Sequence, residues 1–91
     1  MATNAVWVKV DGGRVVQSLH EAREKVAGAQ AEVVLDFSSV CRVDAGALRA
    51  MEGIADAVDG DRTKVVLRGV NIDIYKVLKL MKLSPRFAFR T

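Results

Sequence analysis

Between residues 33 and 58 the spacing of apolar positions changes from that of a strand to that of a helix, and the change falls at residue 44. Residues 33–37 are a continuous apolar run rich in β-branched side chains, which is typical of a buried strand. After a polar break at Ser38 and Ser39, helical periodicity begins, with an apolar face of Ala47, Leu48, Met51, Ile54, Ala55 and Val58. The pattern predicts a strand, a short loop and a helix whose first free amides are capped by Asp44.

The rest of the chain alternates in the same way between strand and helix periods. The further predicted elements are a strand at 5–10, a helix at 14–27 stopped by Gly28, a strand at 64–68, a helix capped by Asn71 and ended by Ser84 and Pro85, and a short edge strand at 86–90. The last helix carries an apolar stripe of Ile74, Val77, Leu78 and Met81. Short strand–helix–strand links imply right-handed crossovers and parallel pairing.

These elements predict an α/β sandwich in which about four strands form a mixed or parallel sheet packed with three helices. A chain of 91 residues is expected to form one domain, spanning residues 1–91. Only one strand precedes the first helix, so the sheet is expected to have an exposed edge. An exposed edge invites pairing with a second copy of the chain, which makes a homodimer one expected assembly.

Residues 35–38 and 43–48 resemble the signature of the STAS domain family. That signature is a hydrophobic strand ending in Asp, a short loop, and then Asp, Ser or Thr, Ser or Gly, Gly and Leu at the start of a helix. The corresponding residues here are Leu35-Asp36-Phe37-Ser38 and Val43-Asp44-Ala45-Gly46-Ala47-Leu48. The resemblance covers about residues 5–85 and implies a STAS-like sandwich and a regulatory role similar to that of bacterial anti-sigma-factor antagonists.

A second similarity involves Gly69-Val70-Asn71, Tyr75 and Lys79-Leu80. These residues resemble the STAS subunit of the bacterial ABC transporter that maintains outer-membrane phospholipid asymmetry. Two partner types are therefore implied, an anti-sigma kinase-like protein or an ABC ATPase. The alternative function, which remains open at this point, is that of a small accessory subunit in phospholipid transport.

Ala45 is the main departure from the family pattern. In antagonists of the switching type the residue after the capping Asp is a phosphorylated Ser or Thr, and an alanine has no oxygen to accept phosphate. The usual kinase switch is therefore not expected at this lost phosphoacceptor position. Ser38 and Ser39 are the nearest hydroxyls and could be phosphorylated instead, although serines that follow a strand are ordinarily turn formers.

The composition limits both compartment and partners. Cys41 is the only cysteine, so no intrachain disulfide can form, and the chain has neither a signal peptide pattern nor an apolar run near the ~18 residues of a membrane helix. We therefore expect a cytoplasmic protein without a membrane span. Residues 1–61 carry six Lys or Arg and ten Asp or Glu (−4), whereas residues 62–91 carry eight and one (+7). This asymmetry can mark a surface for an acidic partner, nucleic acid or anionic lipid, and it can also be a simple solvated face.

Catalytic chemistry is poorly supported by the sequence. Asp36 and Asp44 could form an acid/base or Mg²⁺ pair at the end of the central strand, but a helix cap at Asp44 and loop amides satisfied by Asp36 explain them better. His20 stands alone on a polar helix face, and Cys41 has no identified base beside it. We predict a protein that is not an enzyme, with no catalytic residue, metal site or cofactor.

The predicted function is therefore binding of a protein partner. The expected docking face combines the loop with the exposed start of the following helix, and its residues are Ser38, Ser39, Arg42, Asp44, Ala45, Gly46 and Arg49. Arg42 could also hold an anion at the helix start. Tyr75 with Lys76 and Lys79 forms a small basic and aromatic cluster, which is too little for a nucleic-acid site and suits an ordinary helix or a protein contact.

Overall fold

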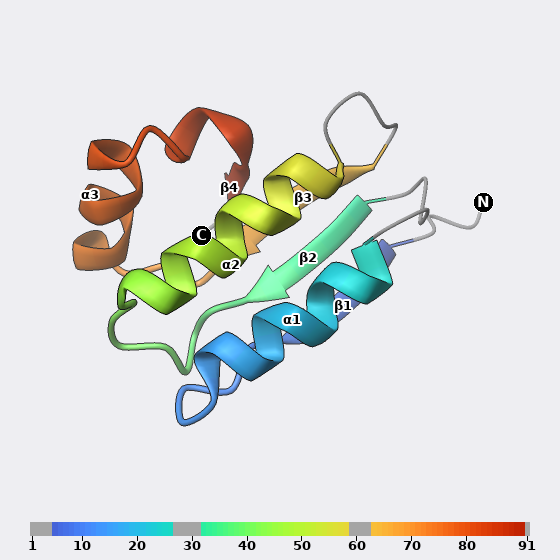
Figure 1. The fold of residues 1–91 in the computed structure, drawn as a ribbon, viewed down its shortest axis with the longest axis horizontal. Coiled ribbons are helices and arrows are strands. Elements are labelled where there is room, and N and C mark those ends of the chain that lie inside the picture. Colours follow the sequence, from blue (N-terminus) through green and yellow to red (C-terminus); the bar gives the residue numbers. More distant parts are fainter. Residues whose placement is uncertain (1–4, 27–31, 59–62, 91) are drawn as a thin grey trace.

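The computed structural model describes residues 5–26, 32–58 and 63–90 and places a four-stranded sheet beneath helices (Figure 1). Its elements are β1 (Ala5–Lys9), α1 (Val15–Val26), β2 (Glu32–Asp36), α2 (Ala45–Ala57), β3 (Lys64–Arg68), α3 (Ile72–Leu80), a 3₁₀ turn (Ser84–Arg86) and β4 (Ala88–Arg90). Neighbouring strands pair in the order β1-β2-β3-β4, and every pair is parallel. The predicted α/β class is confirmed, and the sheet is parallel rather than mixed. Gly28, the predicted helix stop, lies outside the described residues.

The helices cover one face of this sheet. Because the strand order follows the chain and parallel crossovers are right-handed, successive helices lie over the same face. The core confirms this arrangement, since alternate residues of β2 and β3 share one hydrophobic cluster with side chains from all three helices. That cluster includes Val33, Leu35, Val65, Leu67, Leu19, Ala22, Met51, Ile54, Ile74 and Leu78. In Figure 1, α1 and α2 run side by side above the sheet, and α3 stands at one end of the molecule.

The other face of the sheet is covered by long side chains. Val34 and Val66 point away from the helices, yet they are only 0% and 2% exposed. The Arg68 guanidinium carbon lies 5.7 Å from the centre of the Trp7 ring, and to reach β1 the side chain must cross β2. Arg90 crosses β3 in the same manner to form a 3.0 Å ion pair with Glu32. The charged ends remain in solvent while their aliphatic stems cover the valines.

The end of α3 differs from the prediction. The helix stops at Leu80 rather than at Ser84 and Pro85, because Lys82 adopts the left-handed conformation (φ 59°) and closes a Schellman motif. The Leu83 amide donates to the Leu78 carbonyl at 2.8 Å and the Lys82 amide to that of Lys79 at 3.1 Å. Met81, predicted to lie on the apolar stripe, is therefore 54% exposed, because the chain turns away from the core there.

Lys82 is an unusual residue for this position. Glycine is preferred where φ is positive, and a side chain there costs about 1–2 kcal/mol.

The remaining predicted bounds differ from the observed ones by one or two residues, and the strand Lys64–Arg68 has the bounds that the pattern predicts. None of the helices in the described part of the chain has both the length and the apolar character needed to cross a bilayer.

Candidate functional site

The junction between β2 and α2 lies at the surface, as the docking hypothesis requires. Asp44 has an extended backbone (φ −100°, ψ −176°), and its carboxylate accepts a 2.8 Å hydrogen bond from the Ala47 amide. The predicted N-cap is therefore confirmed. Ala45 and Gly46, the first two residues of the helix, are exposed, whereas Ala47 is buried. The small residues leave the backbone of the first turn open to close approach by another molecule.

The turn at residues 37–40, just before this junction, is held by buried side chains and by the Asp36 carboxylate. Phe37 and Val40 are buried, and the Val40 amide donates to the Phe37 carbonyl at 2.9 Å. Asp36 accepts a 2.9 Å hydrogen bond from the Ser38 amide. That bond, with further contributions from the Ser38 hydroxyl and from the charges of Arg68 and Lys9, lowers the pKa of Asp36. The carboxylate is therefore a structural acceptor of hydrogen bonds.

Two glycines from other loops press against the same turn. A Cβ added to Gly12, in the loop between β1 and α1, would lie 2.1 Å from the Ser39 carbonyl oxygen. A Cβ added to Gly69, after β3, would lie 3.0 Å from the Ser38 amide nitrogen, and Gly69 also has a positive φ of 74°. The Ser38–Ser39 turn is thus clamped between two backbone segments, and neither glycine can be replaced without movement.

The Asn71 side chain links the loop at residues 40–41 to α3 through hydrogen bonds. Its side-chain oxygen accepts from the Ile74 amide at 2.8 Å, which confirms the predicted cap of α3. Its side-chain nitrogen donates to the carbonyl of Cys41 at 2.9 Å and to that of Val40 at 3.4 Å. A single side chain therefore caps one helix and fixes the loop that leads into the other.

The double role of Asn71 can be tested by two substitutions. Asn71→Ala removes both functions and is expected to cost about 1–2 kcal/mol of unfolding free energy. Asn71→Asp retains the cap oxygen but loses the donor to Cys41, so we expect a stable helix with a loosened loop. Urea unfolding and amide exchange of residues 40–42 measure the two effects separately. Equal exchange in the wild type and the Asp variant would contradict the tie.

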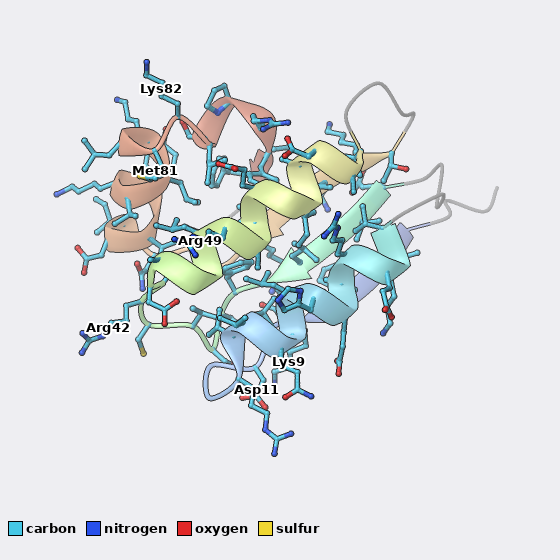
Figure 2. The ribbon with its side chains drawn as sticks, in the orientation of Figure 1. Lys9, Asp11, Arg42, Arg49, Met81 and Lys82 are labelled. Atoms are coloured by element: carbon cyan, nitrogen blue, oxygen red, sulfur yellow. The ribbon has the colours of Figure 1, made fainter. Side chains whose placement is uncertain are left out.

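Two hollows flank the start of α2. An open hollow of about 420 Å³ is lined by Gly12, Gly13, Arg14, Val15, Val16, Gln17, Arg42, Asp44 and Ala47. The second, about 300 Å³, follows the groove between α1 and α2 and is lined by Val16, His20, Arg23, Gly46, Arg49, Ala50 and Gly53. In Figure 2, Arg42 extends outward beside the first turn of α2, whereas Arg49 lies over the helix itself. Cationic side chains therefore border both hollows.

All seven residues predicted for the docking face are exposed and lie along residues 38–49. Arg42 and Asp44 share one hollow, Gly46 and Arg49 share the other, and Ser38 and Ser39 form the clamped turn. Sequence reasoning missed the contribution of the β1–α1 loop, where Arg14 lines the first hollow. It also assigned Asn71 only to a cap, because the contacts of its side-chain nitrogen with Val40 and Cys41 are with a segment distant in sequence.

The two carboxylates near the junction are both used to hold the backbone. Asp36 and Asp44 each accept a backbone amide, and Cys41 is exposed as a free thiol. Within residues 5–26, 32–58 and 63–90, no three His, Cys, Asp or Glu side chains are close enough together to hold a metal ion. The exposed groups at the junction can take part in hydrogen bonding, charge pairing and close packing.

Comparisons with known proteins agree with this geometry. Residues 8–91 match the family model of the STAS domain. The structure is similar to the crystal structure of a candidate anti-sigma factor antagonist from Thermotoga maritima, with a TM-score of 0.72 and 18% identity over 100% of this chain and 83% of that chain. The solution structure of the same Thermotoga maritima protein gives a TM-score of 0.76 and 17% identity, covering 99% and 76%.

The search of curated proteins gave no significant match. The structural likeness, at an identity below 25%, shows the shared fold, and the family model covers most of the sequence. The chain therefore belongs to the STAS domain family.

Proposed function

We propose that this chain is a non-catalytic binding module similar to the anti-sigma-factor antagonists, and that it docks a protein partner through residues 38–49. The observation that carries the proposal is the exposed, capped start of α2, where Ala45 and Gly46 present backbone instead of bulky side chains. A candidate antagonist shares the fold over the whole of this chain. Together these features favour binding of another protein at this surface.

The proposed interface includes both hollows beside the junction. Arg42, with Arg14 from the neighbouring loop, gives the first hollow a cationic rim, and Arg49 does the same for the groove between α1 and α2. Arginine is enriched at protein interfaces because its planar group binds carboxylates at two points. We therefore propose a partner that presents acidic side chains around a small central contact.

Regulation in this proposal does not use phosphate at residue 45. Ala45 has no hydroxyl, and the nearest alternative, the Ser38 hydroxyl, is engaged with Asp36. A module of this kind binds whenever the partner is present, so control passes to the amount of the module or to the state of the partner. Incubation with a kinase of the anti-sigma class is expected to leave Ser38 and Ser39 unlabelled.

Affinity capture from the native host, followed by mass spectrometry, tests the proposal. We expect a kinase of the anti-sigma type to be retained by the wild-type chain and lost from an Ala45→Glu chain. Capture of an ABC ATPase with the same dependence on residue 45 would keep the docking face and assign the chain to phospholipid transport instead. Retention of the same partners by the Glu variant would overturn the proposed interface.

A further inference from the structure

The outward face of α3 carries exposed aliphatic side chains beside lysines. Ile72 and Leu80 are 69% and 81% exposed, and they lie at opposite ends of the helix, about 80° apart around its axis. Lys76 and Lys79 fall between them in sequence, on the outward face. The inward face is occupied by Ile74 and Leu78, which belong to the core. The helix therefore has an apolar side packed in the core and a mixed outer side on which Ile72 and Leu80 are exposed.

The patch continues around the end of the helix. Met81 and Lys82 follow directly and are exposed, and Figure 2 shows the Lys82 side chain extending outward from this end of the molecule. An open hollow of about 540 Å³ lies here, lined by Lys76, Lys79, Leu80 and Lys82. We call the residues Ile72, Lys76, Lys79, Leu80, Met81 and Lys82 the α3 patch.

Lys82 adds an independent reason to look for a ligand. It holds a backbone conformation that glycine would adopt at lower cost, as described above. What the lysine adds at this position is a third positive charge beside Lys79. Strained residues of this kind are often found where a contact with another molecule depends on the side chain.

The chemistry of the α3 patch points to one class of ligand. Its three cations are all lysines, a residue that is depleted in the core of protein interfaces, where arginine is enriched. Lysines beside exposed aliphatic residues suit anionic lipid, because each lysine near a negatively charged membrane surface contributes about 1 kcal/mol of binding free energy. The aliphatic ends can enter the headgroup region, while the ammonium groups stay at the level of the phosphates.

We propose that the α3 patch binds the surface of an anionic membrane. The contact is shallow and reversible: Leu80 and Met81 enter the interface, and Lys76, Lys79 and Lys82 pair with lipid phosphates. Three charges and two shallowly inserted side chains give weak binding that falls as salt is added. The inference does not depend on the proposed function, since the docking face at 38–49 and the α3 patch share no residue.

Co-sedimentation with vesicles tests this inference on the full chain. Vesicles of phosphatidylcholine and phosphatidylglycerol (about 60:40) are expected to retain the protein at low salt, and vesicles of phosphatidylcholine alone are not. Replacing Lys79→Gln together with Lys82→Gly is expected to weaken binding by roughly 20- to 30-fold. Because the glycine relieves the positive φ, this variant should remain folded, so that a loss of binding cannot be attributed to unfolding.

A matched control separates the patch from net charge. Lys25→Gln with Lys64→Gln removes the same charge from exposed positions on α1 and β3, and it should bind vesicles nearly as well as the wild type. Leu80→Gln should lower binding without altering its salt dependence. Equal loss in the control pair, equal binding to uncharged vesicles, or tighter binding to poly-glutamate than to the anionic vesicles would overturn the proposal, the last by favouring an acidic protein.

Discussion

Replacement of Ala45 by Glu is expected to weaken partner binding by about 100-fold or more, close to 3 kcal/mol. Ala45 is exposed at the first position of α2, where the helix backbone is open to another molecule. A glutamate there would put an unpaired charge and extra volume into the centre of the proposed contact. Such a buried, uncompensated charge is among the most costly changes at an interface.

The loss should be specific to binding because the fold tolerates the change. An acidic residue in the first turn of a helix interacts favourably with the helix dipole, so the melting temperature should be unchanged or slightly raised. Ala45→Ser adds only a small hydroxyl and is the matched control, with near wild-type affinity. Calorimetric titration with the captured partner measures both. Equal affinities for the Glu and Ser variants would place the interface elsewhere.

Replacement of Gly12 by Ala is expected to have the largest effect on stability among the glycines of the described residues. The new Cβ would lie 2.1 Å from the Ser39 carbonyl oxygen, which is backbone and cannot rotate away. The loop between β1 and α1 must then move away from the turn at 38–39, which costs about 1–3 kcal/mol of unfolding free energy. In a chain of this size, each kcal/mol of lost stability lowers the melting temperature by roughly 4–8 °C.

Gly13→Ala provides the comparison within the same loop. Its Cβ would be 3.5 Å from Asp11 Oδ1, an ordinary contact, so we expect a change within about 0.5 kcal/mol. Thermal unfolding of the two variants side by side measures the difference. A Gly12 variant as stable as the Gly13 variant would show that the clamp on Ser39 is not needed to hold the turn.

Local patterns were sufficient to predict most of the scaffold. The β-branched runs around Leu35 and Val66 gave the central strands, and helical spacing from Asp44 gave α2. Both N-caps follow from local chemistry, since a side-chain oxygen three residues before a free amide is visible in sequence. The exposure of the residues proposed for docking could also be predicted, because the junction between a strand and an amphipathic helix lies at the end of the sheet.

Contacts between distant segments were beyond the reach of those patterns. Gly12, Gly69 and the Ser38–Ser39 turn come from three loops that meet only when parallel strands align their carboxyl ends. The crossings of Arg68 and Arg90 over the open face likewise depend on strand register. Met81 was misplaced for a different reason. A Schellman motif formed without glycine leaves no local signal, so the helical period extended beyond the actual end of α3.

The central claim, that a protein partner binds at the start of α2, is tested most directly by NMR titration of the ¹⁵N-labelled chain with its captured partner. We predict amide shift changes or broadening concentrated at residues 38–49, while the indole signal of Trp7, on the opposite face of the sheet, stays unchanged. Changes centred on Trp7 and β1, with residues 38–49 unaffected, would contradict the account.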